Sequence, residues 1–160
     1  MKIINIHKRT FNQPKEILGE LLGSLSTKED KIWPYEKWYS MKFENGLKIG
    51  SKGGHGSIRY TIEKYTPNEF IQFIFTKPKG FIGVHSFEIN ELSDDKTELK
   101  HTIKMDVKFA DLFNWIFVIK PLHNALLQDA LDKVENHFNS KNNVVTEWSF
   151  WVKSLRNLLK

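Results

Sequence analysis

The chain begins with an alternating pattern of apolar residues and then changes to a helical one. Residues 2–11 alternate isoleucines with polar side chains, which is typical of a strand. Leucine and isoleucine then recur at helical spacing over 17–22, after a proline suited to a first helical turn and before a glycine that ends it. A second short helix is predicted from Ser26 or Thr27 to the residue before Pro34. The predicted order is one strand and two short helices.

Between residues 38 and 109 the apolar pattern has a period of two and is interrupted by short turn sequences. The turns are rich in glycine, proline, asparagine and aspartate. They are too short for a crossover between parallel strands, so we expect an antiparallel meander. The predicted strands span residues 38–44, 47–51, 57–65, 69–76, 82–92 and 97–108.

The next part of the chain is helical. From Leu122 to Phe138, apolar side chains occupy one half of a helical wheel and polar side chains the other. This pattern predicts a long helix packed along one side. The preceding stretch, Leu112–Ile119, is apolar nearly all round and is followed by Pro121. We therefore expect a separate, deeply placed turn or short helix there.

The chain beyond Asn139 forms a separate segment. Residues 140–143 have the composition of a linker, and residues 144–160 place tryptophans and leucines on one side of a helix, with lysine and arginine largely opposite. The sequence thus predicts a domain over 1–139, followed by a linker and an amphipathic helix over 140–160. Three roles fit this helix: docking on the domain, dimerisation, or peripheral contact with an anionic membrane, where tryptophan is favoured.

Composition places the chain among globular proteins. With 40% hydrophobic and 27% charged residues in a chain of 160, one domain with one core is expected. The absence of cysteine excludes a disulfide scaffold, a thiolate zinc site and a cysteine nucleophile, and it fits a reducing compartment. The N-terminus lacks the apolar run of a signal peptide, and the most apolar stretch is too short to cross a bilayer. We expect a cytoplasmic protein.

The net charge of +5 suits an anionic partner such as nucleic acid or a membrane surface. The lysines, however, are spread along the whole chain among acidic residues, as in Lys28-Glu29-Asp30-Lys31. We therefore expect a solvated surface and no nucleic-acid partner.

Three runs of residues carry a resemblance to a known family: Gly80–Ile89, Thr97–His101 and Ile119–Leu126. Together with the order of elements over residues 2–139, they resemble the helix-grip fold of the START-like, or SRPBCC, superfamily, and its small bacterial members in particular. The resemblance implies an α+β fold in which a curved antiparallel sheet wraps around a long C-terminal helix. It also implies a cavity for a lipid, sterol or polyketide, but no single reaction, because carriers, sensors and enzymes share this scaffold.

Three histidines are the candidates for chemistry. On the last two predicted strands, His85 and His101 each lie on the apolar face. If these strands form a hairpin, their apolar faces coincide and His101 lies opposite Phe87 or Ile89. His85 then lies about 7 to 13 Å from it before side-chain reach. Since His123 falls on the apolar side of the long helix, we expect three imidazoles to point into one interior.

Two interpretations of these histidines stay open. Either they orient a polar group or move protons on an enolisable ligand, or they are buried and hydrogen-bonded to Tyr60, Tyr65, Ser86 or a backbone carbonyl. No carboxylate is placed to support a three-histidine zinc site, so we predict no metal and no cofactor. The glycines between Gly46 and Gly56 lack the order of a phosphate loop and fit turns and close strand packing.

The inward-facing side chains are the predicted ligand contacts. No recognisable catalytic constellation accompanies them, so the leading hypothesis is a non-enzymatic binder or carrier of a small hydrophobic ligand. The alternatives are an aromatase- or cyclase-type enzyme that uses the cavity histidines, and a membrane-associated protein that acts through its C-terminal helix. The predicted contacts are Phe43, Tyr60, Ile62, Phe73, Phe75, His85, Phe87, His101, Ile103, Met105, His123, Leu127, Ala130 and Val134.

Overall fold

The computed structural model describes residues 1–159, so Lys160, the end of the predicted tail helix, lies outside the described residues. Seven strands form one antiparallel sheet in the order β1-β7-β6-β5-β4-β3-β2. They are β1 (Lys2–Phe11), β2 (Lys42–Phe43), β3 (Lys52–His55), β4 (Ile58–Thr66), β5 (Phe70–Lys77), β6 (Phe81–Ser93) and β7 (Lys96–Val107). The helical segments are α1 (Lys15–Gly23), α2 (Phe109–Asn114), the π-helical turn η1 (Trp115–Ile119), α3 (Lys120–Phe138) and α4 (Phe150–Leu158).

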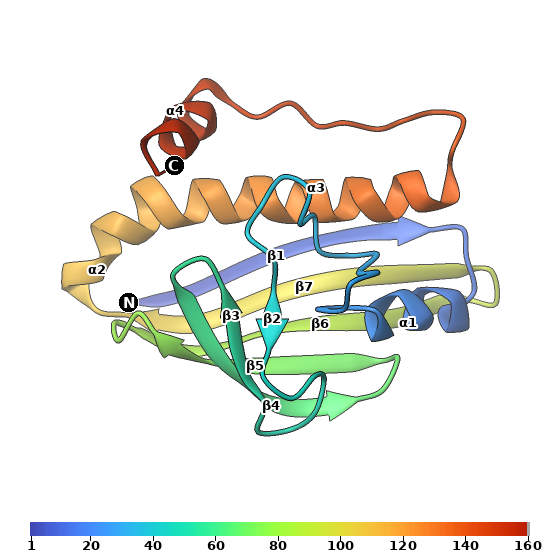
Figure 1. The fold of residues 1–160 in the computed structure, drawn as a ribbon, viewed down its shortest axis with the longest axis horizontal. Helices are drawn as coiled ribbons and strands as arrows, with labels where there is room; N and C mark the ends of the chain where they lie inside the picture. The colour runs from blue at the N-terminus through green and yellow to red at the C-terminus, as the bar shows by residue number, and fades with distance from the viewer. Residues whose placement is uncertain (160) are drawn as a thin grey trace.

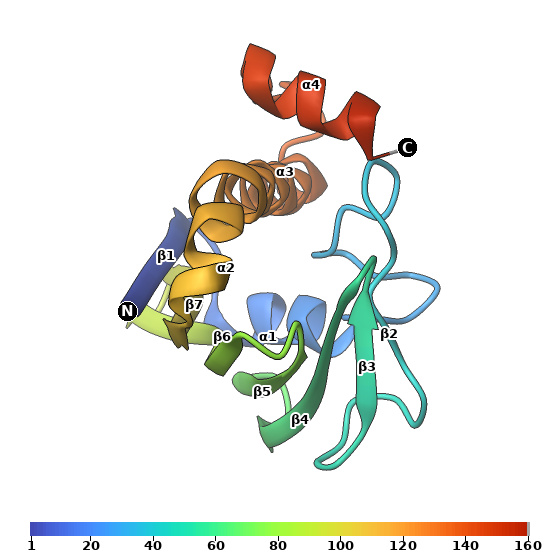
Figure 2. The same ribbon diagram turned by 90° about the vertical axis from the view of Figure 1, so that its left-hand side faces the viewer.

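The sheet is curved into a trough, and α3 lies along its open side (Figure 1). The end-on view shows β1 at one edge of the trough, β2 and β3 at the other, and α1 inside it (Figure 2). This arrangement confirms the predicted α+β helix-grip fold. No helix within residues 1–159 combines the length and the apolar character that crossing a membrane requires.

One predicted element of this fold is wrong: residues 26–33 form turns in place of a second short helix. The cause is the Asp30 carboxylate, which accepts hydrogen bonds from the backbone N–H groups of Ser26, Ile32 and Trp33 at 2.7, 2.9 and 2.7 Å. These bonds compete with helical ones, as aspartate side chains commonly do. Ser26 also has a φ of 66°, which a right-handed helix does not allow.

The predicted strands near the glycine cluster are also wrong in extent. Only residues 42–43 of the predicted 38–44 are extended, and residues 47–51 form turns. Gly46 and Gly50 have φ values of 66° and 85°, in the left-handed region that interrupts a strand. The following strand, β3, pairs with both β2 and β4.

The apolar stretch Leu112–Ile119 is not deeply placed, contrary to the sequence prediction. It runs from α2 through η1 into α3 without a break at Pro121, which lies in the first turn of α3, where a missing N–H is tolerated. Only Trp115 is buried, whereas Phe113 is 71% exposed. The sequence pattern missed this exposure because it does not show that α2 lies at the end of the trough (Figure 2).

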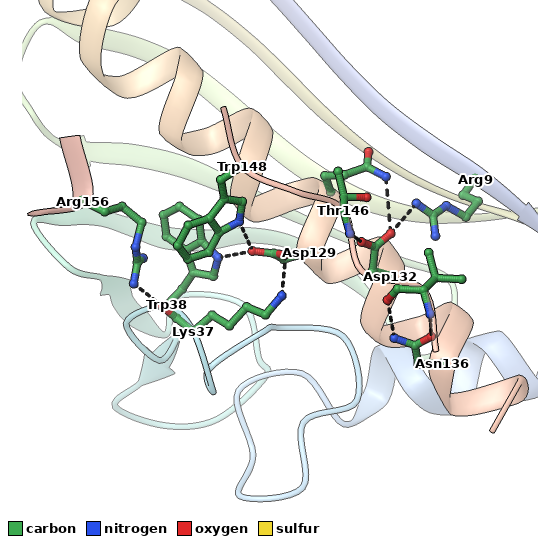
Figure 3. Close-up of polar contacts among 11 residues, drawn as sticks. Arg9, Lys37, Trp38, Asp129, Asp132, Asn136, Thr146, Trp148 and Arg156 are labelled. Atoms are coloured by element: carbon green, nitrogen blue, oxygen red, sulfur yellow. Dashed lines mark hydrogen bonds and ion pairs between the residues drawn. The ribbon is translucent and has the colours of Figure 1, made fainter. Parts of the chain in front are cut away.

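The segment after α3 docks on the domain, one of the three predicted roles. The predicted helix over 144–160 is shorter in the structure, because Ser149 caps its N-terminus and the residues before it are extended. Trp148 donates a hydrogen bond to Asp129 on α3, and the Asp129 carboxylate also accepts from Lys37 and Trp38 (Figure 3). The buried carboxylate therefore links α3, the loop before β2 and the tail.

Candidate functional site

A cavity of about 1140 Å³, partly open to solvent, lies between the sheet and the first half of α3. Its floor is formed by side chains of β4 to β7, and its roof by η1 and α3. The loop before β2 and the last residues of the tail form its mouth. The lining residues that carry the argument below are Trp33, His55, Phe75, Phe81, His85, His101, Ile103, Trp115, Ile119, Leu122, His123, Arg156 and Leu159.

The other end of the trough is solid. There α1 inserts Leu18 and Leu22, which belong to one buried cluster with Leu127 and Val134 of α3. A smaller cluster around Phe81 and Trp115 closes the opposite end. The cavity therefore occupies only the part of the interior that neither cluster fills.

His85 and His101 lie next to each other on the cavity floor. In the β6–β7 hairpin His101 is opposite Phe87, one of its two predicted partners, and His85 is opposite Ile103. His85 and His101 are therefore diagonal neighbours on one face of the hairpin, a spacing that long side chains can bridge. The atoms His85 Nδ1 and His101 Nε2 lie 3.3 Å apart. The predicted separation of about 7 to 13 Å refers to the positions of the two residues along the strands. The ring nitrogens come much closer because both side chains reach toward each other.

Two further imidazoles extend the cluster. The ring of His123 on α3 lies 5.1 Å from that of His101, and the ring of His7 on β1 lies 5.7 Å from that of His123. His7 Nε2 is also 3.0 Å from Asn124 Oδ1. The sequence did not single out His7, because β1 points its polar side inward and leaves Ile4 68% exposed. In the structure, α3 presents polar residues such as Asn124 and Asp132 to the same strand.

His55 was also missed, because it lies in the glycine-rich segment. Its Nδ1 is 3.0 Å from the hydroxyl of Tyr60, and its ring packs on Trp33 at 4.7 Å. Tyr60 in turn meets the ring of His85 edge-on at 4.6 Å. A continuous row of aromatic and imidazole rings therefore connects the mouth of the cavity with its floor.

The cavity keeps its histidines neutral. Burial lowers the pKa values of His85, His101 and His123 well below the ordinary value of 6.5, and the neighbouring histidines lower them further by charge repulsion. Burial likewise lowers the pKa of His55 to about 4. No aspartate or glutamate from residues 1–159 lines the cavity to oppose these effects.

Hydrogen bonds among residues 1–159 satisfy only part of the histidine cluster. Across the described part of the chain, His85 Nε2, His101 Nδ1 and His123 Nδ1 have no hydrogen-bond partner. None of the three histidines is hydrogen-bonded to Tyr60, Tyr65 or Ser86. Within residues 1–159, no group of three or more His, Asp or Glu side chains could hold a metal ion.

The structure divides the predicted contact residues into two groups. Those that line the cavity are Phe75, His85, His101, Ile103 and His123. The others are in the packed interior around it, namely Phe43, Tyr60, Ile62, Phe73, Phe87, Met105, Leu127, Ala130 and Val134.

Comparison with known proteins finds similarity in three dimensions only. The sequence matches no described protein family and no curated protein. A Thermobifida fusca protein solved by NMR has a TM-score of 0.67 at 10% identity, over 90% of this chain and 98% of its own. Norcoclaurine synthase from Thalictrum flavum, solved with dopamine and hydroxybenzaldehyde, has a TM-score of 0.63 at 8% identity, over 90% of each chain. The likeness is one of fold.

A third example is a conserved Enterococcus faecalis protein of unknown function, with a TM-score of 0.61 at 11% identity over 99% of this chain and 85% of its own. All three cover nearly the whole of this chain.

Proposed function

We propose that the protein belongs to the START-like superfamily and binds or transports a small hydrophobic, lipid-, sterol- or polyketide-like ligand. The observation that carries the proposal is the cavity of about 1140 Å³ between sheet and α3, which is large enough for such molecules. Its walls are mostly apolar and aromatic, so burying a ligand there is favoured by the hydrophobic effect. The shared fold with norcoclaurine synthase, which holds two small aromatic molecules, supports it.

The test is a titration with the neutral fluorescent dye N-phenyl-1-naphthylamine, together with native mass spectrometry of protein purified from cells. We expect saturable dye binding and a co-purified apolar molecule. Ile119→Trp should weaken dye binding by filling the cavity, because Ile119 lines it. Ile116→Trp is the matched control, because Ile116 lies on the same π-helical turn and is 42% exposed. Absence of saturable binding, or equal loss in both variants, would contradict the proposal.

A second candidate function is acid–base catalysis by the cavity histidines, as in an aromatase or cyclase. The observation that favours it is the 3.3 Å contact between two neutral imidazoles, one of which can accept a proton while the other donates. The test is deuterium exchange at the α-carbons of 2-decanone in D₂O. Catalysed exchange that is lost in His85→Leu would support this candidate, and exchange at the uncatalysed rate would eliminate it.

A membrane is a suitable source for an apolar ligand. The side chains of Phe109 and Phe113 on α2 and of Phe150 on α4 are exposed. Trp151 of α4 donates a hydrogen bond to the carbonyl of Phe117, which joins α4 to η1. Contact with a membrane through residues 144–160 therefore remains a prediction, extended by the aromatic side chains of α2.

A further inference from the structure

The cavity histidines retain hydrogen-bonding groups that the described chain does not use. His85 and His101 are 4% and 3% exposed, yet each has a ring nitrogen without a partner among residues 1–159. His123 adds a third such nitrogen on the opposite wall. Buried polar atoms without a partner destabilise a protein, so their concentration in one cavity indicates a polar group supplied from outside.

The His85–His101 contact determines what that polar group can be. A neutral imidazole has one N–H and one lone pair, and in this contact one ring donates while the other accepts. Whichever ring donates, the pair retains one N–H and one lone pair at its outer nitrogens. If the pair takes up one proton, both outer nitrogens become N–H donors. An outward N–H donor on a positively charged pair suits a carboxylate oxygen, because charge-assisted hydrogen bonds of this kind are strong.

The surroundings of the pair favour an anionic ligand. The titratable groups that face the pair and His123 are His7 from β1, His55 from β3 and Tyr60 from β4. The charged side chains at the mouth are Lys37, Lys42 and Arg156, and no aspartate or glutamate from the described chain lines the cavity. The lining therefore offers no negative charge to balance a protonated histidine pair. It offers none to an alkylammonium ligand either.

The same surroundings limit the ligand to one negative charge. Once one imidazole is protonated, repulsion within the row of histidines opposes a second proton. A dianionic phosphate would need that second charge, whereas a carboxylate does not.

We propose that the ligand is a hydrophobic molecule ending in a single carboxylic acid, whose carboxylate binds to the His85–His101 pair as the pair takes up one proton from solvent. The inference rests on the proposed ligand-binding function and specifies the ligand class. The proton adds to the free ring nitrogen, the pair becomes a monocation, and a carboxylate oxygen accepts a hydrogen bond from one of its outward N–H groups. A neutral alcohol would bind without this proton.

The test is displacement of N-phenyl-1-naphthylamine by dodecanoate, 1-dodecanol, dodecylammonium and dodecyl phosphate. Dodecanoate should compete at a roughly ten- to hundredfold lower concentration than dodecylammonium, since charge-assisted hydrogen bonds are strong. ¹⁵N NMR of protein with labelled histidines should show an imidazolium signal with dodecanoate and neutral rings with 1-dodecanol. His101→Leu should still bind the dye but lose the preference, and His137→Gln, at an exposed site on α3, should keep it.

The outcomes separate this inference from the proposed function. Dye binding with equal displacement by dodecanoate and 1-dodecanol, and with neutral histidines throughout, overturns the carboxylate assignment and leaves the proposed function standing. Tighter binding of dodecyl phosphate overturns it in favour of a phosphate. Failure of both the dye and 1-dodecanol to bind overturns the proposed function itself. The NMR measurement uses the unaltered protein, so a His101→Leu variant that does not fold leaves the inference testable.

Discussion

At the scale of single residues, the notable feature is a row of imidazoles that burial keeps neutral. His85, His101 and His123 lie on three elements and touch mainly aromatic rings and one another. In the unfolded chain each would titrate at its ordinary pKa of about 6.5. The difference between the two states links the stability of the protein to pH.

We predict that the free energy of unfolding falls as the pH is lowered below 6.5. The folded-state pKa values are lowered, so between them and 6.5 the unfolded chain binds more protons than the folded one. For His55 this window extends from 6.5 down to about 4. Each histidine that stays neutral should contribute a slope approaching about 1.4 kcal/mol per pH unit. Urea unfolding between pH 7.5 and 5 measures the slope.

Variants isolate the contribution of the cluster from that of acidic residues. His101→Leu should make the pH slope shallower by the share of one histidine, because it removes one buried imidazole. Identical slopes in the unaltered protein and His101→Leu would show that the cluster is protonated or hydrated in the folded state.

At the scale of elements, two buried carboxylates of α3 attach the tail: Asp132 accepts from the backbone N–H of Thr146, and Asp129 from the indole of Trp148. Asp129 is 3% exposed and accepts from Trp148 Nε1, Trp38 Nε1 and Lys37 Nζ at 2.9, 2.8 and 2.9 Å (Figure 3). Arg156 on α4 adds a hydrogen bond to the carbonyl of Lys37 and packs over Trp38. The contacts place Arg156 and Leu159 at the mouth of the cavity. Attachment of the tail and closure of the mouth therefore depend on the same residues.

We predict that Asp129→Ala loosens the tail and lowers the free energy of unfolding by about 1 to 3 kcal/mol, because two partly buried indole N–H groups lose their acceptor. Lys37, whose side chain is 42% exposed, can turn to water. Limited proteolysis between residues 139 and 149, together with urea unfolding, measures both effects. Glu147→Ala is the matched control, since it removes an exposed carboxylate from the same segment. Equal protease resistance in both variants would refute this role for Asp129.

At the scale of the whole molecule, exposed aromatic side chains occur on the three helical segments α2, η1 and α4. Phe109 and Phe150 are 91% and 85% exposed, and the rings of Phe113 and Phe117 lie 4.5 Å apart. The same helical segments carry the exposed cations Lys108, Lys120 and Lys153. This combination is typical of surfaces that contact anionic membranes.

We predict that the protein sediments with vesicles of phosphatidylcholine and phosphatidylglycerol and that Phe113→Ser combined with Phe150→Ser reduces the bound fraction severalfold. Ile4→Ser is the control, because Ile4 is equally apolar and 68% exposed but lies on the outer face of β1. A protein that stays in the supernatant at low salt, or a loss that Ile4→Ser reproduces, would contradict membrane contact.

The sequence by itself determined the elements whose partners are near in the chain. Period-two alternation on both sides of Ser93 and Lys96 was sufficient to restrict the partner of His101 to Phe87 or Ile89, because a hairpin has few registers that bring two apolar faces together. The structure selects Phe87. The helical period likewise determined α3. The pattern did not show where a side chain competes with helical hydrogen bonds. The Asp30 carboxylate accepts from the backbone N–H groups of Ser26 and Ile32, so the predicted second helix does not form.

Only the tertiary structure decided where the interior is hollow and which faces are exposed. Leu127 and Val134 lie in solid core because α1 packs there, about a hundred residues away in the chain. His123, one turn earlier on the same helix, meets the cavity. The pattern of α3 is the same at both places, so it could not tell them apart. A helix or strand shows which side is apolar, but the element that covers that side, or leaves it open, comes from elsewhere in the chain.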